Sequence, residues 1–212
     1  MKVYLLAYNG LSAGLWLYIL FQCIANIQRG YFLYKSGGDE IPHSFMLYTQ
    51  IFNSLFELAH SVTGLVPSPI PTLLLQSFAR LIILVGICYV IPESPANYAL
   101  YTFSGLTLAW SITEIIRYGY YFLKLSQKAP ASVPYSITWL RYSAFFILYP
   151  LGLVCESLTV YRSYAVIEHR LPYYSKFLKY ALPLYIPGFV YLYSYMISQR
   201  RKVLKKEKAK LA

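Results

Sequence analysis

The chain has 212 residues, of which 58% are hydrophobic and 13% charged, and its formal net charge is +11. Soluble globular domains contain about a quarter charged residues, so this composition excludes an ordinary soluble enzyme and predicts a protein of the lipid bilayer. Much of the positive charge lies near the end of the chain, in segment 200–210. A basic segment beside a membrane is more typical of contact with anionic lipid than of nucleic-acid binding.

Six apolar stretches are long enough to cross a membrane, since a spanning helix needs about 20 mostly apolar residues. In chain order they are 3–27, 44–66, 72–91, 97–123, 138–161 and 177–198. The connections are short and rich in turn-forming residues, and no linker divides the chain. The sequence therefore predicts an all-α membrane protein, a six-transmembrane-helix bundle with a polar interior site in domain 1–198, followed by a basic cytosolic tail, 199–212.

The distribution of lysine and arginine predicts the orientation of this bundle. These residues are more frequent on the side of the membrane that holds both termini, and the positive-inside rule makes that side cytosolic. Lys208 and Lys210 also have the spacing of a dilysine signal for retrieval to the endoplasmic reticulum. A tail that is merely basic is the competing interpretation.

Four of the predicted spans carry polar side chains at helical spacing. The four sets are Gln50, Asn53, Glu57, His60 and Gly64; Gln76, Arg80 and Gly86; Trp110, Glu114, Arg117, Tyr118 and Tyr121; and Tyr142, Tyr149 and Glu156, with Arg141 near the start of the last span. Steps of three, four and seven residues place side chains on one helical face. Because an ionisable side chain costs about 2.5–3.5 kcal/mol at the membrane centre, we expect these faces to point into the bundle.

Several of these side chains have candidate partners. Glu114 and Arg117 have the i,i+3 spacing of a local ion pair, and Glu57 can pair with Arg80 across two helices. Structural and functional roles are both open for these charges. We expect His60 to be a hydrogen-bonded interior histidine rather than a base, because no second histidine or metal-ligand cluster accompanies it.

Tyr149 and Glu156 are the candidate acid and base. Seven residues correspond to nearly two turns, so both side chains share a face and lie about 10 Å apart along the helix axis. A kink at Pro150 would change this separation. Gly152, between them, either leaves room for a substrate chain or allows close helix packing.

Motifs of other chemistries are lacking in the sequence. It contains no glycine-rich phosphate loop, no HExxH and no GxSxG motif, so we expect no cofactor and no metal. Cys23 and Arg29 have the C-x5-R spacing of tyrosine phosphatases, but the preceding histidine and the glycines of a phosphate-binding loop are missing. We interpret this spacing as coincidence.

Longer motifs resemble one known family. They are 64–69 (GLVPSP), 109–118 (AWSITEIIRY), 139–142 (WLRY), 148–152 (LYPLG) with Glu156, and 185–188 (YIPG), together with Tyr8, Asn9, Gln76 and Arg80. In these residues the chain resembles the 3-hydroxyacyl-CoA dehydratases of very-long-chain fatty acid elongation, also called protein tyrosine phosphatase-like proteins. The resemblance covers nearly the whole chain.

The resemblance implies a six-span enzyme of the endoplasmic reticulum membrane that removes water from a (3R)-3-hydroxyacyl-CoA to give the trans-2-enoyl-CoA, the third step of the elongation cycle. It implies catalytic roles for Tyr149 and Glu156, and elongase and reductase enzymes as partners. Substrate binding or structural support is implied for Glu57, Gln76, Arg80, Glu114, Arg117, Arg141 and Gly152.

Dehydration needs a base for the C2 proton and an acid for the departing hydroxyl. Our hypothesis gives Glu156 the first role and Tyr149 the second, and the reverse assignment stays open. Arg80, Arg117 and Arg141 fall in the cytosolic half of their spans, where they could bind the CoA phosphates or only pair with acids. A small transporter and a catalytically silent scaffold of the elongation complex are the alternative functions.

Overall fold

The computed structural model describes residues 1–28, 43–127 and 133–211, and every regular element in these ranges is a helix. The α-helices described there are α1 Lys2–Gln28, α2 Ser44–Val62, α3 Ile70–Leu81, α4 Gly105–Ser126, α5 Tyr135–Ser143, α6 Phe145–Tyr164, α7 Pro172–Ala181 and α8 Tyr185–Leu211. The prediction of an all-α fold is confirmed.

Short irregular helices extend or interrupt the predicted spans. The π-helical stretches Ile82–Tyr89 and Leu100–Ser104 continue α3 and precede α4, and the 3-10 turns Pro95–Asn97 and Ala165–Ile167 lie in connections. The predicted span 177–198 is split, because Leu182–Leu184 form a 3-10 turn between α7 and α8. Its central residue, Pro183, has no backbone N–H to continue a helix.

The last helix does not end where the predicted tail begins. α8 runs from Tyr185 to Leu211, so the basic residues after position 198 extend the last helix instead of following it as a separate segment. In the fifth span, a turn at Ala144 separates α5 from α6, and α6 continues through Pro150.

Three helical stretches in the described residues are long and apolar enough to cross a membrane by length and composition: Lys2–Gln28, Ile70–Tyr89 and Tyr135–Ile167. The other predicted spans are more polar or interrupted. α2 and α4 carry the charged side chains described below, and α8 follows the turn at Pro183 and ends among basic residues. The structure thus supports a helical membrane protein, and the six-span arrangement stays a prediction.

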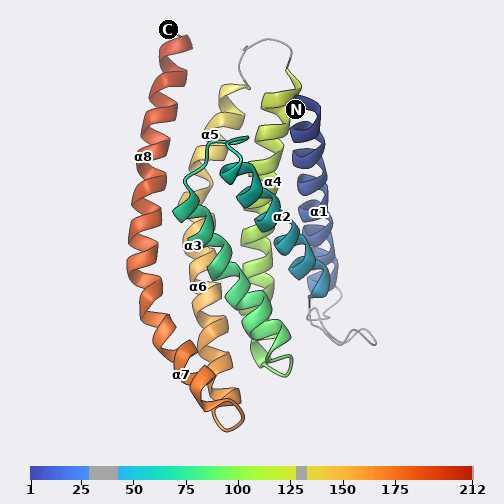
Figure 1. The fold of residues 1–212 in the computed structure, drawn as a ribbon, viewed down its shortest axis with the longest axis vertical. Coiled ribbons are helices and arrows are strands. Elements are labelled where there is room, and N and C mark those ends of the chain that lie inside the picture. The colour runs from blue at the N-terminus through green and yellow to red at the C-terminus, as the bar shows by residue number, and fades with distance from the viewer. Residues whose placement is uncertain (29–42, 128–132, 212) are drawn as a thin grey trace.

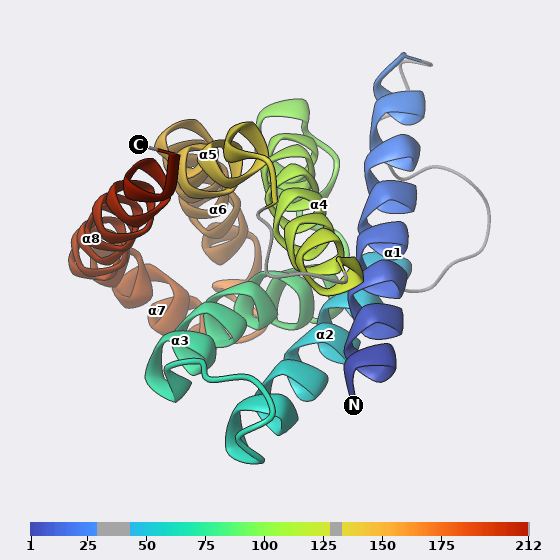
Figure 2. The ribbon, with the colours of Figure 1, turned by 90° about the horizontal axis from the view of Figure 1, so that it is seen from above.

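α4 connects the two halves of the bundle. α1 packs along it on one side and α6 on the other, while α2 contacts α1 and α3, and α8 packs against α5 and α6. Seen from above, α1 and α8 lie on opposite sides of the bundle (Figure 2). Both chain ends lie at the same end (Figure 1), where Nζ of Lys2 donates to the Gln127 carbonyl at 3.1 Å.

The bundle buries polar groups and exposes apolar ones, as a lipid-facing protein should. The side chain of Glu114 is buried, whereas Ile147 is 75% exposed and Val154 is 54% exposed. Trp16 and Leu106 are fully buried, on α1 and α4. The inward direction predicted for the polar residue Glu114 is confirmed.

Candidate active site

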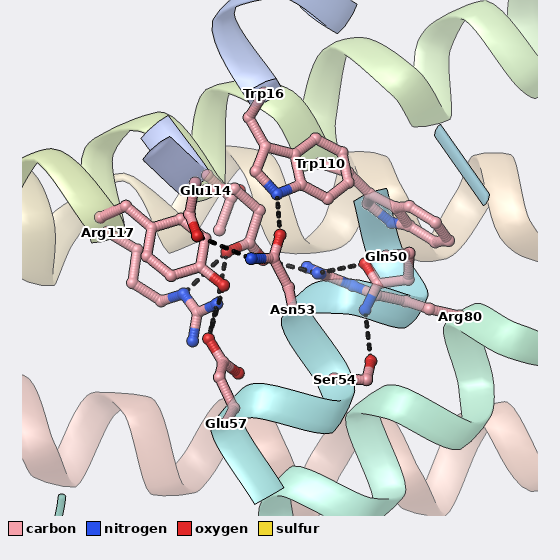
Figure 3. Close-up of polar contacts among 12 residues, drawn as sticks. Trp16, Gln50, Asn53, Ser54, Glu57, Arg80, Trp110, Glu114 and Arg117 are labelled. Atoms are coloured by element: carbon pink, nitrogen blue, oxygen red, sulfur yellow. Dashed lines mark hydrogen bonds and ion pairs between the residues drawn. The ribbon is translucent and has the colours of Figure 1, made fainter. Parts of the chain in front are cut away.

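Two acids and two arginines form an ion-pair network between α2, α3 and α4 (Figure 3). Glu114 of α4 contacts both arginines: its Oε1 lies 2.6 Å from Nη1 of Arg80, and its Oε2 accepts a hydrogen bond of 2.7 Å from Nε of Arg117. Arg117 also pairs with Glu57 of α2. Equal numbers of opposite charges reduce the cost of burying each of them.

The partners within this network differ in part from the predicted ones. The local pair of Glu114 and Arg117 is confirmed. The predicted pair of Glu57 with Arg80 is wrong, because Glu57 contacts Arg117 and Arg80 contacts Glu114. Glu114 and Arg117 of α4 both face α2 and α3. Arg80 of α3 therefore pairs with Glu114, and Glu57 of α2 pairs with Arg117.

Neutral polar groups complete the ion-pair network. Tyr118 donates to Oε1 of Glu57 at 2.6 Å, and Nη1 of Arg80 donates to Oε1 of Gln50 at 3.2 Å. The guanidinium of Arg117 also lies over the Tyr118 ring, 4.4 Å from its centre. The network holds three helices together and uses much of the hydrogen-bonding capacity of both arginines.

Two further residues on the polar face of α2, Asn53 and His60, bind α1. Nδ2 of Asn53 donates to Oγ of Ser12 at 2.7 Å, and its Oδ1 accepts from Nε1 of Trp16 at 2.9 Å (Figure 3). Nε2 of His60 lies 2.7 Å from the Tyr4 hydroxyl. The prediction that His60 is a hydrogen-bonded interior histidine is confirmed. Asn53 and His60 thus serve the packing of α2 against α1.

The Glu156 carboxyl is held by α4. Nε1 of Trp110 donates to Oε1 of Glu156 at 2.9 Å, and the Arg80 guanidinium lies over the Trp110 ring, 4.9 Å from its centre. Arg80 therefore links the ion-pair network to the indole that positions the acid. The sequence pattern places Trp110 on the inward-pointing face of its helix but assigns it no role. Its hydrogen bond to Glu156 depends on how α4 and α6 are aligned, which the pattern does not contain.

Tyr149 of α6 lies against α8. Its ring stacks on Phe189 at a centre-to-centre distance of 5.3 Å and on Tyr193 at 6.2 Å. Tyr149 precedes Glu156 by seven residues on the same helix. The two candidate catalytic groups thus share the part of α6 that lies between α4 and α8.

Tyr185, at the start of α8, adds a second phenol to this region. Its hydroxyl is buried and finds no hydrogen-bond partner among the described residues. A buried polar group without a partner calls for an explanation such as a bound ligand. Tyr185 belongs to the motif 185–188, but the sequence pattern alone assigns this residue no role.

The remaining predicted residues have different surroundings. Gln76 is exposed on α3 and lies outside the ion-pair network, so the inward direction predicted for it is wrong. Nε of Arg141 is buried without a partner among the described residues, and its guanidinium lies 5.4 Å from the centre of the Tyr142 ring. Gly152 is buried, and a Cβ added there would meet Trp110 and Ala109 at an ordinary contact distance of 3.8 Å.

The structure describes Cys23 of the C-x5-R spacing and the positions of the His, Cys, Asp and Glu side chains in its ranges. Cys23 is buried, and its thiol donates to the Ser104 carbonyl at 3.7 Å; Arg29 of the C-x5-R spacing lies outside the described residues. No group of three or more His, Cys, Asp and Glu side chains suited to a metal ion occurs in these ranges.

Comparison with known proteins finds a family model and named relatives that match the chain. The sequence model of the family described as protein tyrosine phosphatase-like protein, PTPLA, matches residues 50–206. The very-long-chain (3R)-3-hydroxyacyl-CoA dehydratase PASTICCINO 2 of Arabidopsis thaliana is 32% identical over 98% of this chain and 95% of its own. No solved structure matches the chain.

Two further relatives carry the same enzyme name. The dehydratase hpo-8 of Caenorhabditis elegans is 33% identical over 96% of this chain and 95% of its own length. The very-long-chain (3R)-3-hydroxyacyl-CoA dehydratase 2 of Homo sapiens is 31% identical over 95% of this chain and 80% of its own.

Proposed function

The chain belongs to the protein tyrosine phosphatase-like family, PTPLA, and on this basis we propose that it is a hydro-lyase that converts a (3R)-3-hydroxyacyl-CoA into the trans-2-enoyl-CoA. The reaction is the dehydration step of very-long-chain fatty acid elongation. The observation that carries the proposal is the similarity along nearly the whole length of relatives that are named for this reaction. The half-buried acid Glu156 and two phenols on α6 and α8 supply the chemical groups that it needs.

In the proposed reaction Glu156 takes the C2 proton of the substrate. The C2–H electrons form the C2=C3 double bond, and the C3–O bond breaks. Tyr149 gives its proton to the departing hydroxyl, which leaves as water. Transfer of the proton from Glu156 to the Tyr149 phenolate, directly or through a water, restores both groups.

Trp110 and Tyr185 support these two groups. The Trp110 N–H occupies Oε1 of Glu156, which leaves Oε2 to receive the C2 proton. We assign the partnerless Tyr185 hydroxyl to the thioester carbonyl oxygen, where negative charge develops as the C2 proton is removed. A hydrogen-bond donor at that position stabilises the transition state more than the ground state.

The ion-pair network is proposed to support the site rather than to bind substrate. Glu57, Arg80, Glu114 and Arg117 contact one another, and Arg80 lies over the Trp110 ring that binds Glu156. Gly152 lies one turn before Glu156 and beside the same indole, which supports a role in leaving room for the substrate. The exposed Gln76 and the partly satisfied Arg141 keep the role of substrate binding or structural support.

We further propose a six-span arrangement in the endoplasmic reticulum membrane with both termini cytosolic. Each of the six predicted spans contains helix, and the two chain ends lie at one end of the bundle (Figure 1), as an even number of crossings requires. Membrane lipid surrounds this bundle, and elongase and reductase enzymes of the cycle are the proposed partners, since they form the hydroxyacyl-CoA and consume the enoyl-CoA.

One assay tests the activity. Purified protein is incubated with a long-chain (3R)-3-hydroxyacyl-CoA, and the trans-2-enoyl-CoA is measured. We expect turnover by the unchanged chain and a loss of about 10²–10⁴-fold in kcat for Glu156→Gln and for Tyr149→Phe. A silent scaffold or a transporter would form no enoyl-CoA although it is folded, and undiminished activity of both variants would remove these residues from the mechanism.

A further inference from the structure

The substrate in the proposed function carries a nucleotide with several phosphates, and these charges need a binding site. Arg80 and Arg117 are poor candidates because both are bound to carboxylates inside the bundle. A phosphate site needs basic side chains that are open to the aqueous phase and can approach several oxygens at once. The structure has such a place at the end of the bundle where α5 begins and α8 ends.

A pocket of about 380 Å³ lies between these two helices. Its volume is within the range of small-molecule sites. Six described residues line it, three of them basic, two aromatic and none acidic: Tyr135, Trp139, Arg200, Leu204, Lys205 and Lys208. The pocket also lies at the N-terminal end of α5, where the helix dipole favours an anion.

The lining combines a fixed cation, mobile cations and an exposed aromatic ring. Nε of Arg200 donates to Oγ of Ser143 at 3.0 Å, and its guanidinium lies over the Phe146 ring at 5.3 Å. Lys205 and Lys208 are exposed. Trp139 is 46% exposed, so its indole is open to stacking with a base.

A continuous line of contacts leads from this pocket to Tyr149. The same face of α8 that forms the pocket packs on Phe146 through Tyr193, and Tyr193 and Phe189 then stack on Tyr149. Trp139 and Tyr149 are separated by about 15 Å along the helix direction at 1.5 Å per residue. An extended pantetheine arm can span such a separation.

We propose that this pocket binds the phosphorylated adenosine of the acyl-CoA, with the adenine stacked on Trp139 and the phosphates held by Arg200, Lys205 and Lys208. The inference rests on the proposed function and adds the location of the substrate head. The pantetheine arm then follows the contact between α8 and α5–α6 to bring the thioester to Tyr149 and Glu156. An anionic lipid headgroup shares the phosphate chemistry and is the competing occupant.

Kinetics with two substrates test the proposal. The variant Lys205→Gln/Lys208→Gln is compared with Lys202→Gln/Lys206→Gln, which removes the same charge from exposed positions of α8 outside the pocket. The substrates are a (3R)-3-hydroxyacyl-CoA and the matching hydroxyacyl-pantetheine, which lacks the nucleotide and phosphates. We expect the pocket variant to raise KM for the CoA ester roughly tenfold with kcat kept, and to leave the pantetheine ester and the control variant unaffected.

Binding of adenosine 3′,5′-bisphosphate gives a readout that does not need turnover. Trp139 is the exposed tryptophan, whereas Trp16 and Trp110 are buried, so stacking should quench the Trp139 emission, and Trp139→Phe should abolish the change. The bisphosphate should bind equally in neutral and anionic bicelles.

Three outcomes decide between the possibilities. Quenching without turnover of either ester would support the pocket and reject the proposed activity. Turnover with no change in KM for the pocket variant would overturn the pocket. Loss of bisphosphate binding in anionic bicelles, with KM unchanged in the pocket variant, would assign the pocket to lipid.

Discussion

The indole N–H of Trp110 donates a 2.9 Å hydrogen bond to the Glu156 carboxyl across the contact between α4 and α6. Trp110 itself lies under the guanidinium of Arg80. The orientation of the proposed base therefore depends on a neutral donor that is held in place by a charged residue of another helix.

Replacing Trp110 by Phe tests this dependence. The ring is kept and the donor is lost, so we expect kcat to fall about 10- to 100-fold, the range of a hydrogen bond to a charged group, while KM changes little. Trp16→Phe is the matched control, because it removes a bond of equal length to Asn53 away from Glu156. It should lower the melting temperature and keep kcat; a similar loss of kcat in both variants would indicate a structural effect only.

Tyr185→Phe separates catalysis from stability. The hydroxyl has no partner among the described residues, so its removal should leave the melting temperature unchanged or slightly raised. If the hydroxyl binds the thioester oxygen, kcat should fall about 100-fold or more. Tyr174→Phe provides the contrast, because that hydroxyl donates to the Gly86 carbonyl at 2.9 Å: we expect a loss of about 1 kcal/mol in stability with normal kcat.

His43 predicts a pH dependence of stability. It precedes α2, outside the predicted spans, stacks on Phe103, and its Nε2 lies 2.9 Å from the Asn97 carbonyl. Burial lowers the pKa of His43 from 6.5 to about 4. The unfolded chain then binds more protons between these values, so the contribution of neutral His43 is complete above pH 6.5 and is lost as the pH falls to about 4.

The expected loss is about 2 to 3 kcal/mol over this range, measured as a fall in melting temperature in detergent. His43→Asn is the matched variant, since asparagine tolerates the positive φ of 59° found here and does not titrate. Its melting temperature should vary less between pH 6.5 and 4. An equally steep dependence in the variant would assign the effect to other groups.

Local features of this fold follow from the sequence more readily than contacts between helices. The i,i+3 pair of Glu114 and Arg117 and the inward direction of Glu114 depend on helical periodicity alone. The exchange of partners between Glu57 and Arg80 depends on how far α2 and α3 are displaced along α4, which periodicity does not contain. The same holds for the bond from Trp110 to Glu156.

Hydropathy also misses breaks that backbone chemistry imposes. The stretch 177–198 is uniformly apolar enough to suggest one span, yet the 3-10 turn around Pro183 divides it and places Tyr185 at the start of α8. Hydropathy alone therefore does not predict the position of Tyr185 at the start of α8. Gln76, predicted for the site by resemblance, is exposed.

The two acids of the ion-pair network should contribute unequally to stability. Glu114 contacts Arg80 and Arg117, and its side chain is 4% exposed, whereas Glu57 has one arginine partner and is 17% exposed. Glu114→Gln removes the buried carboxylate from two half-buried guanidinium groups, so we expect a loss of up to about 3–5 kcal/mol and a clearly smaller loss for Glu57→Gln. Thermal unfolding in detergent measures both. Equal losses, or normal stability with a raised KM for acyl-CoA, would favour a direct role of these charges in binding.

Substitution of two glycines at the contact between α4 and α6 tests whether Gly152 serves helix packing or leaves space for the substrate. A Cβ at Gly105 would lie 2.7 Å from Sγ of Cys155, which is too close, whereas a Cβ at Gly152 would meet Trp110 at 3.8 Å. Gly105→Ala must therefore displace the Cys155 side chain or the helix that carries it, and should lose about 1–3 kcal/mol of stability. Gly152→Ala should fold normally and lower kcat/KM, because the added methyl group takes space beside the indole that holds Glu156. The decisive measurement is the melting temperature of each variant beside its kcat/KM for the same hydroxyacyl-CoA. If Gly152→Ala melts early and its folded fraction is fully active, Gly152 is a packing residue and the substrate passes elsewhere.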